Sequence, residues 1–386
     1  MNNEIYFDSS ATTSLCPEAK AAMTAVIENV YGNPSSLHSV GLAAEKILNE
    51  ARSDVLASLG VRGDGRQLIF CGSGSEANNL ALIGSYTSKK RKNGARVIIT
   101  EGEHSSIEAA AKHLETLGAD VYRLSTKNGE IDFIELQDAL TPETVLISVM
   151  LVNNETGAVY PVSDIFKTAK ALCPDIICHC DAVQGYSKIK FTPKNLSADL
   201  LTVSAHKIHG PKGIAALYVS PEILKKRALV PIIHGGQQEN GLRAGTENVI
   251  GIAGFGAAAK AISQSDNVCD VFKYITARLS EDAALSEIRF NKPKKGVNHI
   301  INVTLPNIKS ETMLHFLSGK GIFVSSGSAC SSHSKSVSRA LSAFGISDKE
   351  ADCSIRISIS RYNTVEEAKT LCDALADGLK SLIRIK

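Results

Sequence analysis

Two short, mainly apolar runs are each followed by residues with reactive side chains: residues 176–184 are IICHCDAVQ and residues 200–207 are LLTVSAHK. Runs of this kind are typical of strands that are covered on both faces of a parallel sheet. Similar runs occupy residues 68–71, 96–100, 145–152 and 214–219. Helical patterns separate them at residues 42–59, 106–117 and 162–172. This order predicts an α/β domain with a mostly parallel sheet.

The pattern changes after a Gly- and Ala-rich helix predicted for residues 249–262. Strands are then predicted at residues 300–305 and 354–360, and helices at residues 310–320 and 365–382. We therefore expect a large α/β domain over residues 15–260 and a smaller α+β domain formed by residues 1–14 and 261–386. A length of 386 residues agrees with two or three domains of ordinary size.

Composition argues against several classes of protein. The 42 basic and 40 acidic residues give a formal net charge of +2, which does not suit a protein that coats nucleic acid or binds membranes through a basic surface. The longest apolar run, residues 249–259, is too short for a membrane span, which needs roughly 20 residues. The start, MNNEIYFDSS, lacks the basic and apolar regions of a secretory signal. We expect a cytoplasmic protein that binds neither membrane nor nucleic acid directly.

The nine cysteines do not indicate a disulfide framework, because their number is odd and their spacing irregular. Cys71, Cys178 and Cys180 lie in predicted strands, where cysteine behaves as a small buried hydrophobe. Strand alternation turns Cys178 and Cys180 to one face and His179 to the other, so we expect no metal site. The cysteines leave open whether one of them is a reactive thiol.

A glycine-rich segment, GSGSEA at residues 72–77, follows a predicted strand and opens a helical run. Glycines there allow the backbone to approach a phosphate closely. An ordinary turn with a serine cap would look the same. The segment also fits the dinucleotide fingerprint G-x-G-x-x-A, with Glu101 as a possible ribose ligand, although Gly74 and Glu101 are further apart than the usual ~20 residues.

Polar side chains follow four of the predicted strands: His104, Asn154, Asp181 and Lys207. The carboxyl ends of parallel strands share one edge of the sheet, where ligands bind. A lysine placed after a buried strand can be partly desolvated and act as a nucleophile toward carbonyls. Each residue alone could equally be an ordinary surface residue. Together with a phosphate cradle they suit a phosphorylated carbonyl cofactor, and pyridoxal phosphate fits best.

The chain resembles the cysteine desulfurases of the NifS/IscS type, which belong to the class-V aminotransferase group of fold-type I pyridoxal-phosphate enzymes. The resemblance rests on motifs in order along nearly the whole chain: residues 6–13 (YFDSSATT), 74–76 (GSE), 103–104 (EH), 152–157 (VNNETG), 180–184 (CDAVQ), 204–207 (SAHK), 241–248 (GLRAGTEN), 326–330 (SGSAC) and 355–358 (IRIS). It implies a seven-stranded, mostly parallel sheet covered by helices, with a smaller α+β domain.

The resemblance also implies roles for individual residues. Lys207 would bind the cofactor through its amine and move protons at the substrate, and Asp181 would pair with the pyridinium nitrogen. His104 would stack on the ring, while Asn154 and Gln184 would bond near the phenolic oxygen. The phosphate would be held by Gly74, Ser75, Ser204, His206 and, from the partner subunit of a homodimer, Thr246.

Two further residues would act on the substrate. Arg356 would hold the carboxylate of L-cysteine, and strand alternation in residues 355–359 independently turns Arg356 away from its isoleucine neighbours. The Cys330 thiolate would attack the substrate sulfur, giving alanine and a persulfide. Residues 325–338 contain eight serines, so a flexible loop is predicted around Cys330. A sulfur-acceptor protein, in iron–sulfur cluster assembly or tRNA thiolation, would receive the sulfur.

Three alternatives remain at this point. A selenocysteine lyase or an aminotransferase would use the same cofactor. A dinucleotide-dependent oxidoreductase could be built on residues 72–77, but it leaves Lys207, Arg356 and Cys330 unexplained. A non-enzymatic sulfur carrier would use Cys330 without pyridoxal phosphate.

Overall fold

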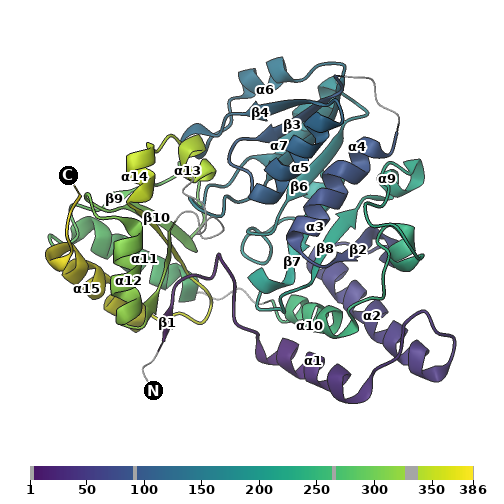
Figure 1. Ribbon diagram of the computed structural model, residues 1–386, viewed down its shortest axis with the longest axis horizontal. Coiled ribbons are helices and arrows are strands. Elements are labelled where there is room, and N and C mark those ends of the chain that lie inside the picture. Colours follow the sequence, from purple (N-terminus) through teal and green to yellow (C-terminus); the bar gives the residue numbers. More distant parts are fainter. Residues whose placement is uncertain (1–3, 90–93, 263–266, 327–337, 386) are drawn as a thin grey trace.

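The computed structural model describes residues 4–89, 94–262, 267–326 and 338–385. Its largest sheet has seven strands in the order β2-β8-β7-β6-β5-β3-β4 (Figure 1). The strands are β2 (Leu68–Cys71), β3 (Arg96–Thr100), β4 (Asp120–Leu124), β5 (Thr144–Met150), β6 (Ile177–Asp181), β7 (Leu200–Ser204) and β8 (Ala215–Val219). Neighbouring strands are parallel except at β8, which is antiparallel to β2 and β7. The mostly parallel α/β sheet predicted from the sequence is confirmed.

Strand β4 was missed by the sequence prediction. It lies at the edge of the sheet, beside β3, and its first four residues are exposed or only partly buried. An edge strand of this kind needs no continuous apolar run. Its sequence, DVYRL, therefore differs from the buried strands on which the prediction was based.

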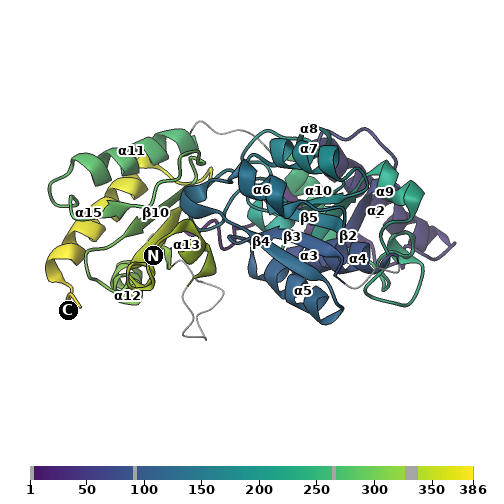
Figure 2. The same ribbon diagram turned by 90° about the horizontal axis from the view of Figure 1, so that it is seen from above.

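Helices cover both faces of this sheet (Figure 2). One face carries α3 (Gly74–Asn79) and α5 (Ser105–Thr116), and the other carries α7 (Val162–Leu172) and α10 (Val249–Lys260). Side chains alternate along β3, so that Val97 and Ile99 enter the core under α5 while Ile98 enters the core under α7. The remaining helices of this part are α1 (Pro17–Asn29), α2 (Ser39–Ser58), α4 (Ser85–Thr87), α6 (Phe133–Ala139), α8 (Pro193–Leu196) and α9 (Pro221–Lys226).

The C-terminal part has its own sheet and its own core. Four antiparallel strands follow the order β12-β13-β10-β9: β9 (Arg289–Phe290), β10 (Ile300–Thr304), β12 (Ser325–Ser326) and β13 (Ser354–Ser358). The helices here are α11 (Asn267–Glu281), α12 (Ser310–Gly319), α13 (Arg339–Phe344), α14 (Asp348–Asp352) and α15 (Val365–Ser381). Side chains from α11, α12 and α15 form the core with β10 and β13.

The N-terminal segment belongs to both parts. Strand β1 (Ile5–Tyr6) pairs in parallel with β11 (Ile322–Phe323), and Phe7 is buried in the C-terminal core. The chain then crosses to the large sheet, where α1 packs against α10. Within the described residues, no helix is long and apolar enough to cross a membrane.

Helices α2 and α10 approach closely because Gly256 in α10 has no side chain. A Cβ atom at this position would lie 2.7 Å from the Cα atom of Ala51 in α2. We expect Gly256→Ala to lower the free energy of unfolding by about 1–3 kcal/mol, since the backbones must move apart. Unfolding by urea should be followed by far-UV circular dichroism, because the chain has no tryptophan.

Gly319 in α12 is the matched control, since a Cβ atom there meets nothing within 4 Å. Gly319→Ala should leave stability unchanged or raise it slightly, because alanine favours helix. Equal urea midpoints for the two variants would contradict the assigned packing of α2 on α10.

Candidate active site

A cavity of about 500 Å³ opens at the carboxyl ends of the large sheet's parallel strands. This is the edge where parallel α/β sheets bind ligands. Ten of the sequence-predicted site residues line the cavity: Gly74, Ser75, His104, Asn154, Asp181, Gln184, Ser204, His206, Lys207 and Arg356. The structure therefore brings together residues that are up to 282 positions apart (356 − 74) in the chain.

Asp181 is the last residue of β6 and is only 6% exposed. Its Oδ2 atom accepts a hydrogen bond of 2.8 Å from Nδ2 of Asn78, and Oδ1 accepts one of 3.0 Å from the backbone N–H of Val183. Hydrogen bonds to a carboxylate favour its charged form. These two donors hold the Asp181 carboxyl group in place in the lining of the cavity.

The same donor connects Asp181 to His104. Nδ2 of Asn78 also donates to Oγ of Ser106, at 2.9 Å, and this hydroxyl lies 2.8 Å from Nδ1 of His104. His104 caps α5, where the backbone N–H of Ser106 donates to Nδ1 at 3.2 Å. The ring is therefore held by its Nδ1 atom, in a network that begins at the buried carboxylate.

Glu103 is a second buried carboxyl beside Asp181. Its Oε1 atom accepts hydrogen bonds from Thr100 and from the backbone of Met150, while Oε2 has no hydrogen-bond partner among the described residues. Burial, followed by the charge of Asp181, raises the pKa of Glu103 well above its usual value. Burial therefore favours the neutral form of Glu103.

Lys207 follows β7 in a short helical turn, Ala205–Lys207. Its Nζ atom donates to the backbone carbonyls of Ser10 and Ala11, the second at 2.7 Å. Gln184 is bound to the same segment, because its Nε2 atom donates to the Ser10 carbonyl at 2.9 Å. The N-terminal segment thus fixes two of the predicted site residues.

Hydroxyl and imidazole groups gather at another side of the cavity. Ser204 is buried at the end of β7, and Ser75 lies in the first turn of α3. Nδ1 of His206 lies 3.2 Å from Oγ1 of Thr12. Desolvation, together with the nearby charge of Lys207, lowers the pKa of His206 to about 4. His206 is therefore neutral at pH 7 and can donate a hydrogen bond to an anion.

Arg356 enters the cavity from β13 of the C-terminal sheet and is 3% exposed. Its guanidinium donates to Oδ1 of Asp8 at 2.8 Å and to the backbone carbonyl of Asn154 at 2.9 Å. Its Nε atom has no hydrogen-bond partner within the described part of the chain. A buried guanidinium of this kind is suited to bind a carboxylate in the cavity.

Glu155 lines the cavity next to Asn154 and is 8% exposed. It accepts a hydrogen bond from the hydroxyl of Ser338, which caps α13. Burial raises the pKa of Glu155 to about 7, against the lowering effect of the Ser338 hydrogen bond and of Arg356. Arg339 forms an ion pair of 2.8 Å with Glu108 on α5. Through these two contacts, Ser338 and Arg339 bind to residues of the part of the chain that contains the large sheet.

The donor set fits pyridoxal phosphate. Asp181 offers a buried carboxylate for a pyridinium nitrogen, Lys207 offers an amine for an aldehyde, and Ser75, Ser204 and neutral His206 offer donors for a phosphate. The unpartnered Nε atom of Arg356 adds capacity for a further anionic group.

One predicted residue lies elsewhere. Thr246 is exposed and does not line this cavity in the single chain. Cys330 lies outside the described residues. Sequence reasoning missed Asp8, Asn78, Glu103 and Ser106, although the first and third belong to motifs that it quoted. Asn78 carried a weaker signal, since it falls one helical turn after Gly74.

The dinucleotide alternative does not agree with the fold. In that fingerprint the glycine-rich turn follows the first strand of a parallel βαβ unit. Here residues 72–77 follow β2, which lies at the edge of the sheet and pairs with β8 in antiparallel orientation. The turn therefore occupies a different position from the one that a dinucleotide site requires.

The sequence matches the family model described as "Aminotransferase class-V" over residues 5–371. The chain belongs to the class-V aminotransferases. Within this family it belongs to the NifS/IscS-type cysteine desulfurase group. A relative named "Cysteine desulfurase IscS" from Dictyoglomus turgidum is 36% identical over 97% of this chain and 94% of the relative. The members of this family depend on pyridoxal phosphate.

Solved structures of this family have the same fold. One, named "NIFS-LIKE PROTEIN", has a TM-score of 0.88 at 31% identity and covers 98% of this chain and 100% of its own. Another, described as "SspA in complex with cysteine", has a TM-score of 0.81 at 32% identity and covers 93% of this chain and 100% of its own. The fold-type I architecture expected from the sequence is thereby confirmed.

Glu155 gives this class-V aminotransferase a specific pH dependence of stability. The unfolded chain ionises Glu155 near pH 4.5, whereas the folded chain keeps the proton to about pH 7. Raising the pH through this window therefore favours the unfolded state, by up to about 3 kcal/mol. Urea unfolding between pH 4.5 and pH 7 should show that the free energy of unfolding falls with rising pH in the wild type but not in Glu155→Gln. Glu45→Gln, on the exposed face of α2, is the control. If the free energy of unfolding had the same pH slope in the wild type and in Glu155→Gln, this would contradict the raised pKa of Glu155.

Proposed function

We propose that the protein is a pyridoxal-phosphate-dependent cysteine desulfurase that converts L-cysteine to L-alanine and passes the sulfur to Cys330. One observation carries the proposal: Lys207, Asp181 and Arg356 line one cavity. An amine, a buried carboxylate and a buried guanidinium are the groups that an amino-acid-processing enzyme of this class needs. The names of its relatives and the solved structure with cysteine support the choice of substrate.

Asp181 would hold the cofactor's ring nitrogen, His104 would lie against the ring, and Gln184 and Asn154 would reach its phenolic oxygen. Ser75, Ser204, His206 and the backbone at Gly74 would hold its phosphate. When bound, pyridoxal phosphate supplies an electron sink for the electron pair released at the substrate's α carbon. The Asp181 carboxyl group, held by the Asn78 side chain and the Val183 backbone, would accept a hydrogen bond from a protonated ring nitrogen.

Arg356 would bind the substrate carboxylate. Its guanidinium already meets the Asp8 carboxylate at 2.8 Å, so the substrate enters a place where negative charge is stabilised. Lys207 would accept the proton from the substrate's α carbon and return a proton at its β carbon. Two backbone carbonyls hold Nζ of Lys207 in this cavity, which fixes the direction of the amine.

Cys330 would receive the sulfur as a persulfide. Its thiolate forms the new S–S bond to the substrate sulfur, the substrate's Cβ–S bond breaks, and the β carbon takes up a proton to give alanine. Ser338 and Arg339, bound to Glu155 and Glu108, fix the chain eight and nine residues after Cys330. A sulfur-acceptor protein of iron–sulfur cluster assembly or tRNA thiolation would then take the sulfur.

Substitutions separate the roles of Lys207 and Cys330. Lys207→Ala should lose the visible absorption band of the bound cofactor and all alanine formation, because it removes the amine that binds the aldehyde. Lys212→Ala, at an exposed lysine five residues on, is the matched control and should keep both. Absorption spectra and amino-acid analysis after L-cysteine addition measure these outcomes.

Cys330→Ser should keep the absorption band but lose persulfide formation, because serine lacks the accepting thiol. Normal sulfur release by this variant would contradict the role of Cys330. Formation of a keto acid instead of alanine would favour an aminotransferase. Release of selenide from selenocysteine, without turnover of cysteine, would favour a selenocysteine lyase.

We also propose that the chain forms a homodimer through α1, α2 and α10. These helices pack together, and they and the segment between α1 and α2 expose a group of large apolar side chains: Ile27, Tyr31, Leu37, Leu42 and Ile250. Tyr31 is 88% and Leu37 is 92% exposed in the single chain. Thr246, three residues before α10, is exposed near this helix and would contribute to the partner's cofactor site.

The double variant Tyr31→Lys/Leu37→Lys should be monomeric, because it places two charges in the proposed interface. Size-exclusion chromatography with light scattering measures the mass. Ile134→Lys, which changes a 71% exposed side chain on α6, should remain dimeric. A monomeric wild type, or a double variant that stays dimeric, would contradict the proposed interface.

A further inference from the structure

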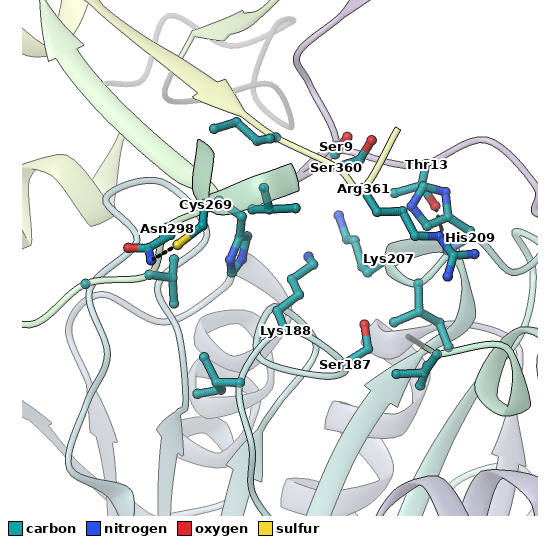
Figure 3. A pocket seen from close by; sticks show the side chains of 18 residues that line it. Ser9, Thr13, Ser187, Lys188, Lys207, His209, Cys269, Asn298, Ser360 and Arg361 are labelled. Carbon is teal, nitrogen blue, oxygen red and sulfur yellow. Dashed lines mark hydrogen bonds between the residues drawn. The ribbon is translucent and has the colours of Figure 1, made fainter. Parts of the chain in front are cut away.

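A second cavity, of about 420 Å³, lies beside the active site and shares Lys207 with it as a lining residue (Figure 3). Its other walls come from the N-terminal segment, from the segments after β6 and β13, from the segment before β10, and from α11 together with Ile262. The large sheet and the C-terminal sheet therefore both contribute to it. Figure 3 shows the side chains of Lys188 and Lys207 extending into the same space.

The charged side chains of this cavity all have the same sign. Lys188, Lys207 and Arg361 line it, and no aspartate or glutamate does so among the described residues. His209 and His299 line it as well, and burial lowers the pKa of each. A cleft lined by cationic groups of one sign attracts anions.

Two buried nitrogen atoms of these lining residues lack hydrogen-bond partners among the residues that the structure describes. Nε2 of His299, a residue that is 5% exposed, has none, and neither has Nε of Arg361. Buried polar atoms are nearly always paired with protein or with a bound molecule. The hydrogen bonding of Lys188 is also weak: its Nζ atom donates to Oε1 of Gln184 over a long distance of 3.3 Å. Desolvation, then the charges of Lys207 and Arg356, lower the pKa of Lys188 to about 7.

Five polar side chains also line the cavity: Ser9, Thr13, Ser187, Asn298 and Ser360. The lining also has an apolar part. Isoleucine and valine side chains from both sheets' segments form it: Ile189, Ile208, Ile262, Val268, Val297 and Ile359. A cavity of this volume is within the range of sites for small organic ligands. Its occupant must therefore combine a negative charge with a hydrocarbon body.

We propose that this cavity binds a small organic carboxylate, with Lys188, His299 and Arg361 around its charged group. The site is separate from the carboxylate position at Arg356, which lines the first cavity and not the second. A bound carboxylate stabilises the protonated form of Lys188, so binding at pH 7 takes up about half a proton. The proposal holds whether or not the enzyme acts on L-cysteine.

Isothermal titration of the cofactor-loaded enzyme with butyrate, in two buffers of different ionisation enthalpy, tests this directly. We expect saturable binding with proton uptake, at least about tenfold tighter for butyrate than for formate, because three more carbons meet the apolar walls. Bromide tests for a purely inorganic anion site. Bromide or formate binding as tightly as butyrate would overturn the proposal.

Variants locate the binding. Lys188→Met should weaken butyrate binding at least about tenfold and abolish proton uptake. Lys190→Met, at an exposed lysine two residues on, is the matched control and should bind as wild type does. Loss of binding in Arg356→Met together with full retention in Lys188→Met would overturn the proposal, since butyrate would then occupy the active site.

Chemical labelling of the wild type gives a readout that no folding defect affects. Butyrate should protect Lys188, but not Lys190, from acetylation by an N-hydroxysuccinimide ester, as quantified by mass spectrometry of peptides. Equal labelling of Lys188 with and without butyrate would overturn the proposal.

Discussion

The segment Asp8–Thr13 is the connection on which the rest of the site depends. Asp8 pairs with β13 of the C-terminal sheet and binds Arg356 through its carboxylate. The carbonyl of Ser10 accepts hydrogen bonds from both Lys207 and Gln184. Thr13 bonds through its backbone to the carbonyl of His206, at 3.0 Å. One short segment, which makes a turn at residues 9–11, thereby links Arg356 to Lys207.

The electrostatics of the site follow from burial. Desolvation raises the pKa of Glu103 well above its usual value and, together with the charge of Lys207, lowers the pKa of His206 to about 4. Asp181 is held by two hydrogen bonds from donors of fixed position. Lys207 lines both cavities, the first together with Arg356 and the second together with Lys188 and Arg361. Among the described residues, no aspartate or glutamate lines the second cavity.

The sequence could predict what depends on strand order. Buried parallel strands are nearly continuous apolar runs, so their ends could be located, and residues at those ends must share one edge of the sheet. This is why Asp181, Lys207, His104 and Asn154 were expected together. The edge strand β4 lacked such a run and was missed.

What remained hidden depends on side-chain contacts between distant segments or on a second chain. Asn78 and Ser106 become part of the site only when α3 and α5 pack side by side. Asp8 acquires its role only when the first residues meet β13. Thr246 lies outside the cavity in one chain, so its predicted place in a partner's site stays a prediction. Cys330 was singled out by its serine-rich surroundings and its motif, and lies outside the described residues.

A single turnover in the absence of reductant tests the central claim most directly. The cofactor-loaded enzyme is mixed with L-cysteine, alanine is quantified, and the intact chain and its peptides are weighed by mass spectrometry. The account predicts one alanine per chain and the added mass of one sulfur atom on the peptide that contains Cys330. Alanine formed without added sulfur on that peptide, or sulfur found on another cysteine, would contradict it.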